Sequence, residues 1–142
     1  METAKKTTIT VSATINAPVA KVWDIWTNPE QIKQWTFASD DWHAPYADND
    51  LRVDGTFKTT MAAKDGSFSF DFAGVYTEVE NHKLIKYVLG DGREVKITFT
   101  EEGNMTKVHE TFDPETQNSI EMQQSGWQSI LDNFKKYVEE KK

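Results

Sequence analysis

The sequence of 142 residues contains no cysteine, which excludes disulfide bonds, thiolate catalysis and cysteine-ligated metal sites. Arginine is nearly absent too: Arg52 and Arg93 are the only two, so a cluster that grips phosphates through paired hydrogen bonds is not expected. No apolar run approaches the roughly 18 residues of a membrane-spanning helix. The polar stretch Met1–Thr8 lacks the apolar segment of a signal peptide. We therefore expect a cytoplasmic protein without a membrane partner.

The charge of the chain is strongly acidic, with a formal net charge of −7 and a pI of about 4.9. Such a surface repels phosphate backbones, so no nucleic-acid partner is expected. The length and the 37% of apolar residues predict one globular domain over residues 1–142. Aromatic residues reach 12%, which indicates a lined cavity or a partner surface.

The first third of the chain predicts a strand followed by two short helices. Residues 7–15 alternate between apolar and polar and are typical of a half-buried strand. Pro18 and the pair Asn28-Pro29 suit helix starts, and the apolar residues after each recur at helical spacing. Residues 37–50 are irregular and predict either a short strand or a loop across the mouth of the fold.

The rest of the chain predicts hairpins and then one long helix. Tight-turn sequences separate alternating segments at Asp65-Gly66, Gly90-Asp91-Gly92 and Gly103-Asn104. Gly74, within a strand, indicates a bulge or bend. Asn118 and Glu121 resemble a capping box, and an apolar stripe continues to about Glu139. The expected fold is of the α+β class: an antiparallel sheet of six or seven strands curves around the helix at 118–139 and leaves a cavity between them.

The phases of these elements turn a set of side chains toward that cavity, because strand residues two apart share a face and helix residues three or four apart share a stripe. Ordinary core packing is the alternative for each aromatic residue taken alone. The predicted ligand-binding residues are Trp42, His43, Met61, Phe70, Phe72, Phe99, Glu110, Phe112, Gln123, Trp127, Ile130 and Phe134.

Glu110 is the most informative polar residue, since its neighbours in phase, Val108 and Phe112, should point inward. A buried carboxylate costs several kcal/mol unless it is paired or protonated. Glu110 is therefore in an ion pair with a lysine or Arg93, at an edge open to water, or available as a ligand anchor or an acid or base. Gln123 either meets the same ligand or satisfies Glu110.

No metal or cofactor is expected, because the three histidines lack metal-ligand spacing and no phosphate loop or nucleophile elbow is present. His43 either acts as an acid or base at the mouth or lies in solvent. Gly126 inside the long helix costs about 1 kcal/mol relative to alanine. Either a strand passes close to it or the cavity needs the space.

Three stretches resemble a known family: Ile15-Asn16-Ala17-Pro18 with Val22-Trp23 and Trp35, Gly74–Val79 with Leu84 and Tyr87, and Gly126–Phe134. Together they resemble the SRPBCC superfamily, also called START-like or helix-grip, and within it the bacterial homologues of the activator of heat shock protein 90 ATPase. The resemblance covers almost the whole chain. It implies a helix-grip fold with a deep pocket between the sheet and the long helix. Members of the superfamily bind lipids, sterols, polyketides, flavonoids or plant hormones, and a few are cyclases or hydrolases.

The leading functional hypothesis is a non-catalytic binder of an apolar or aromatic, lipid- or polyketide-like molecule, monomeric or weakly dimeric. One alternative is a cyclase- or hydrolase-like enzyme with Glu110 and His43 as acid and base. Another is an interaction module for a chaperone ATPase. An enzyme should bring two titratable groups to one point of the pocket. A binder needs only one or two polar anchors, and a chaperone partner should leave an exposed patch outside the pocket.

Overall fold

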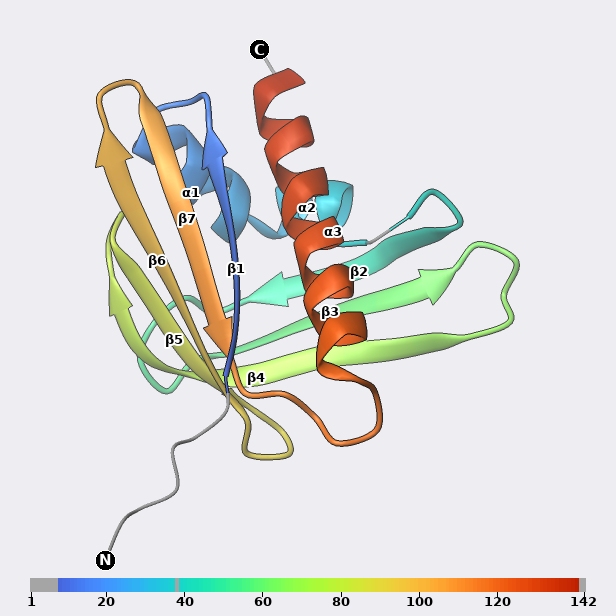
Figure 1. Cartoon of the computed structure of the whole chain (residues 1–142). Helices are drawn as coiled ribbons and strands as arrows, with labels where there is room; N and C mark the ends of the chain where they lie inside the picture. The colour runs from blue at the N-terminus through green and yellow to red at the C-terminus, as the bar shows by residue number, and fades with distance from the viewer. Residues whose placement is uncertain (1–7, 38, 141–142) are drawn as a thin grey trace, which may run out of the picture.

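The computed structural model describes residues 8–37 and 39–140, which form a seven-stranded sheet and three helices. The strand order is β1-β7-β6-β5-β4-β3-β2, and every neighbouring pair is antiparallel. The strands are β1 Ile9–Ile15, β2 Trp42–Asn49, β3 Thr56–Ala63, β4 Ser69–Glu80, β5 Leu84–Leu89, β6 Glu94–Glu102 and β7 Met105–Phe112. Figure 1 shows the strands turning from steep at β1 and β7 to nearly level at β3 and β4, so that the sheet curls around α3. The predicted α+β helix-grip architecture is confirmed.

The helices are α1 Val19–Thr27, α2 Pro29–Trp35 and α3 Ile120–Glu140. Asn28 caps α2 as predicted, since its side chain accepts a hydrogen bond from the Glu30 amide at 3.0 Å. The cap of α3 is shifted by one residue from the prediction. The Met122 amide donates to the Ser119 hydroxyl at 3.1 Å, whereas the Asn118 side chain donates to Glu115.

The predicted hairpin turns are present, and their glycines have the positive φ angles that such turns need: 79° at Gly66, 92° at Gly92 and 67° at Gly103. Residues 42–49 of the irregular segment form the edge strand β2, where Pro45 is tolerated because one side of the strand has no partner. The bulge expected near Gly74 falls a little later, between Tyr76 and Glu78, where the register with β5 shifts.

The helix α3 covers the free side of the other edge strand, β1. Its polar side chains hydrogen-bond backbone groups of alternate residues along β1 and just after its end, on the side of the strand that has no neighbouring strand. The pairs are Gln124 with Thr10 (3.3 Å), Gln128 with Ser12 (3.0 and 3.4 Å), Lys135 with Thr14 (2.8 Å) and Glu139 with Asn16 (2.8 Å). These bonds satisfy edge groups that would otherwise lack protein partners and hold the helix along one side of the concave face.

Across the described parts of the chain, no helix combines the length and the apolar character needed to cross a bilayer.

Candidate functional site

A cavity of about 100 Å³ lies between the concave face of the sheet and α3. Its walls are mainly aromatic, and the charged groups among them are both acidic. Most of the lining residues are buried or half-buried, and Asp48 is exposed. They are Trp26, Ile32, Trp35, Thr36, Asp48, Asn49, Phe57, Thr59, Met61, Phe72, Tyr76, Ile85, Tyr87, Glu110, Trp127 and Ile130.

Glu110 lies on β7, between β1 and β6, and borders the cavity with only 6% of its surface exposed. Its cross-strand partners are Val11 on β1 and Ile97 on β6, which are themselves 2% and 1% exposed. Neither hydrocarbon neighbour can satisfy a carboxylate, and none of the described residues forms a hydrogen bond or ion pair with it. Burial raises the pKa of Glu110 to about 8, so the side chain mostly carries a proton at neutral pH.

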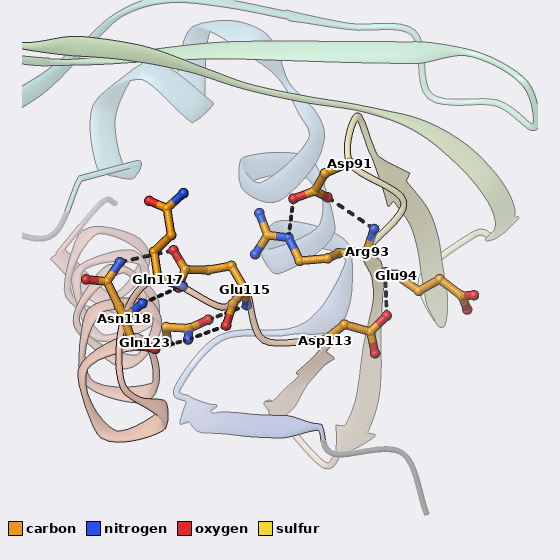
Figure 2. A network of polar contacts seen from close by, with 8 residues as sticks. All are labelled: Asp91, Arg93, Glu94, Asp113, Glu115, Gln117, Asn118 and Gln123. Carbon is orange, nitrogen blue, oxygen red and sulfur yellow. Dashed lines mark hydrogen bonds and ion pairs between the residues drawn. The ribbon is translucent and has the colours of Figure 1, made fainter. Parts of the chain in front are cut away.

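Two of the alternatives for Glu110 are thereby removed. Of the two predicted kinds of partner, no lysine of the described residues is paired with Glu110, and Arg93 is bound to Asp91, with 2.7 Å between its Nε and the carboxylate oxygen. Figure 2 shows the Arg93 guanidinium held against Asp91. An edge position open to water is also wrong, because β7 lies between β1 and β6. The remaining alternative is a polar group available to whatever enters the cavity.

Two tyrosines supply further polar atoms to the cavity. Burial raises the pKa of Tyr87 well above its usual range, and the charge of Glu110 adds to the effect. Burial likewise raises the pKa of Tyr76, whose hydroxyl donates to Asn49. Asn49 in turn donates to the Thr27 carbonyl at 2.7 Å. Both phenols therefore stay neutral across the physiological range, as hydrogen-bonding groups rather than charges.

The predicted site residues divide between the cavity and its surroundings. Five line the cavity: Met61, Phe72, Glu110, Trp127 and Ile130. Three others lie in the core behind its walls. Phe112 stacks under Trp127, Phe99 packs between Trp23 and Trp26, and Phe134 packs between Trp26 and Trp35. These three are on the predicted inward face, but larger rings stand between them and the cavity.

The remaining four predicted residues lie away from the cavity. Trp42 and Phe70 contact each other on the outer part of the β2–β4 region, where Phe70 is 43% exposed. His43 is exposed on β2. Gln123 is buried but fully used, since it accepts from the Glu115 amide at 2.8 Å and donates to the carbonyls of Glu115 and Asn118. Figure 2 shows the hydrogen bonds that join Gln123 to Glu115 and Asn118 in the segment between β7 and α3.

Several lining residues were not predicted, and some of them had a signal in the sequence. Phe57 and Thr59 share the strand face of Met61, and Tyr87 alternates in phase with Ile85. The lining residues of α1 and α2, such as Trp26 and Trp35, had no such signal, because the packing of a short helix on a sheet is decided by tertiary contacts. Within the described residues, no cluster of three or more acidic or histidine side chains could hold a metal ion.

Comparison with known proteins agrees with this geometry. The profile of the family described as "Activator of Hsp90 ATPase homolog 1-like protein" matches residues 16–139. No curated protein matches the chain. The solution structure of an AHSA1-like protein from Aeromonas hydrophila is 47% identical, with a TM-score of 0.88 over 94% of this chain and 92% of that one.

Two further structures extend the comparison. A protein from Cytophaga hutchinsonii is 56% identical, with a TM-score of 0.80 over 92% of this chain and 91% of that one. A Chromobacterium violaceum protein with 20% identity shares the fold, with a TM-score of 0.84 over 95% and 99% of the two chains. The chain therefore belongs to the Activator of Hsp90 ATPase homolog 1-like family, an SRPBCC-type family, as its sequence motifs indicated.

Proposed function

We propose that the protein binds a small apolar or aromatic molecule in the cavity between the sheet and α3, with Glu110 as its polar anchor. The observation that carries the proposal is the unpartnered, buried Glu110 carboxyl group among aromatic walls. No side-chain nitrogen or oxygen of the described residues is both fully buried and without a partner, so the Glu110 oxygens are accessible from the cavity, where a ligand could hydrogen-bond them. The cytoplasm remains the predicted location.

The size of the cavity limits the ligand. An apolar protein cavity of about 150 Å³ can hold benzene, whereas pockets for drug-sized ligands measure about 300–1,000 Å³. A space of about 100 Å³ therefore suits a short chain or at most a single ring. A flavonoid-sized ligand would require α3 to move away from Phe72 on β4, where Trp127 now makes an edge contact at 5.8 Å.

The enzymatic alternative has less support, because only one of its two proposed catalytic residues, Glu110 and His43, lines the cavity. Glu110 borders the cavity, whereas His43 is exposed on β2 and does not line it. An acid and a base that act on one substrate must both reach it. A single buried carboxyl group is the arrangement expected of a binder with one polar anchor.

The binding proposal is tested by titrating ¹⁵N-labelled protein with single-ring compounds such as benzyl alcohol and with a larger flavonoid. We expect saturable shifts of the Trp26 and Trp127 indole signals. In parallel, Trp127→Phe should remove most of the ligand-induced fluorescence quenching. Trp42→Phe is the matched control, since Trp42 lies outside the cavity, and it should leave the quenching in place. No saturable response to any compound of the panel would refute the proposal.

A second candidate function is contact with a chaperone ATPase, which the family description suggests. It is favoured by an exposed aromatic cluster formed by Trp42, Phe68 and Phe70, whose ring centroids are 6.0 to 6.1 Å apart. Phe68 is 59% and Phe70 is 43% exposed, and exposed apolar clusters of this kind often mark interaction surfaces.

The chaperone candidate is tested by measuring the ATPase rate of a purified bacterial heat shock protein 90 with and without this protein. The double substitution Phe68→Ser with Phe70→Ser should abolish any stimulation. Met105→Ser, which changes an exposed apolar residue elsewhere on the surface, should preserve it. An unchanged ATPase rate with the wild-type protein would reject this candidate and leave the binding proposal unaffected.

A further inference from the structure

The ionisable side chains that line the cavity and can carry a charge near neutral pH are both acidic: buried Glu110 on β7 and Asp48 at the exposed part of the lining. No lysine, arginine or histidine is among the lining residues of the described chain. On the basis of the proposed binding function, we propose further that the ligand is a small protonated amine, with the Glu110 carboxylate as its counter-ion and the aromatic rings as its walls.

The sheet around Glu110 supplies no compensation for a negative charge. Val11 and Ile97 flank it on both neighbouring strands, and Ile85 continues the same row onto β5. Without a cation beside it, the carboxyl group avoids the cost of a buried charge by holding a proton. An ammonium ion can replace that proton. The carboxyl group then releases H⁺ to solvent as the cation enters, and the net charge of the pair stays zero.

The aromatic walls favour a cation over a neutral or anionic ligand of the same shape. Tryptophan is the ring that attracts ammonium groups most strongly, and the attraction grows when the cation is removed from water. Trp26, Trp35 and Trp127 all line the cavity, together with Tyr76 and Tyr87. An ammonium group is only a donor, and the Glu110 oxygens are only acceptors once ionised. An anionic ligand would instead meet two acidic side chains and no cation.

The pH dependence of binding separates the possible ligand charges. A cation needs ionised Glu110, so its affinity should rise with pH until Glu110 is fully ionised and then level off. A neutral alcohol that accepts a hydrogen bond from protonated Glu110 should lose affinity over the same range. The other groups facing the cavity do not disturb this signal strongly. Tyr76 and Tyr87 stay neutral because burial raises their pKa values, helices α1 to α3 contribute no ionisable lining residue, and Arg93 is paired with Asp91. Asp48 is the remaining ionisable lining group.

The test uses benzylamine, benzyl alcohol and benzoate, three single-ring probes that differ mainly in charge. Each is titrated into the full chain at several pH values from 6.5 to 8.5, with NMR detection of the tryptophan indoles. We expect benzylamine to bind at least about tenfold more tightly than benzyl alcohol at pH 8.5. Its affinity should fall by about tenfold per pH unit below pH 8, as expected when one proton is released on binding. Calorimetry in two buffers of different ionisation enthalpy measures that proton directly.

Glu110→Gln keeps the shape of the side chain and removes the charge, so it should abolish the advantage of benzylamine and its pH dependence while benzyl alcohol still binds. Glu101→Gln, which changes an exposed glutamate near the end of β6 that does not line the cavity, is the matched control and should change neither. If benzyl alcohol or benzoate binds as tightly as benzylamine at every pH, the amine proposal is wrong and the binding function stands. If no probe binds, both proposals fail.

Discussion

The indole of Trp127 on α3 lies flat on the ring of Phe112 on β7, with centroids 3.7 Å apart and planes 13° from parallel. Phe112 follows Glu110 by two residues on the same face of the strand and is 1% exposed. The stack therefore fixes the height of α3 above the sheet directly beside the buried carboxyl group. The same indole separates Phe112 from the cavity, which explains why one ring lines the cavity and the other does not.

The first prediction concerns this stack. Phe112→Leu should lower the free energy of unfolding by about 1–2 kcal/mol, because it removes an aromatic pair and part of a fully buried ring. It should also change the fluorescence of Trp127. Both are measured in one urea titration. Phe70→Leu is the control, since Phe70 is 43% exposed, and its effect should stay within about 0.5 kcal/mol. Equal losses in the two variants would contradict the role of the stack.

A second prediction contrasts two glycines. A Cβ atom at Gly126 would meet no atom within 4 Å, and Gly126 does not line the cavity, so neither predicted reason for this glycine holds. Gly126→Ala should therefore stabilise the protein by about 1 kcal/mol. At Gly74 a Cβ atom would lie 2.7 Å from the Val88 carbonyl oxygen. Gly74→Ala should lower the melting temperature, whereas Gly126→Ala should raise it.

The third prediction distinguishes the two possible caps of α3. Ser119→Ala removes the hydroxyl that accepts from the Met122 amide and should cost about 1 kcal/mol. Asn118→Ala removes only an exposed side-chain bond to Glu115 and should cost about 0.5 kcal/mol or less. Thermal unfolding of both variants measures the difference. A larger loss for Asn118→Ala would instead favour the capping box that the sequence pattern suggested.

The fold could be predicted from the sequence because its signals are local. Alternation within each strand and positive-φ glycines at Gly66, Gly92 and Gly103 define hairpins without reference to the rest of the chain. The inward direction of Glu110 follows from the same alternation, since β7 is regular along its whole length. For these features a local pattern is enough.

The extent of the site could not be predicted, because it depends on where α3 crosses the sheet. Phe70 and Phe72 share one face of β4, but only Phe72 lies under Trp127, and Phe70 lies beyond it in solvent. Gln123 belongs to the apolar stripe of α3, yet the preceding loop folds back and uses its amide. Strand and helix periods identify a face and leave open which part of that face another element covers.

The last prediction is that Glu110 makes the protein less stable as the pH rises. Its pKa is about 8 in the folded protein against 4.5 for an ordinary glutamate, so the folded state binds this proton more tightly than the unfolded state. The stabilisation is complete below about pH 4.5 and is lost progressively as the pH rises to about 8. Urea unfolding of wild type and Glu110→Gln between pH 5.5 and 8.5 measures the effect. The difference between the free energies of unfolding, Glu110→Gln minus wild type, should increase by about 1.4 kcal/mol per pH unit up to about pH 8 and stay constant above it. Desolvation of the new amide shifts the whole curve but does not depend on pH, so the slope is the readout. Parallel curves for the two proteins would mean that Glu110 is ionised and solvated in the folded state. That result would contradict its proposed role as the buried polar anchor of a ligand.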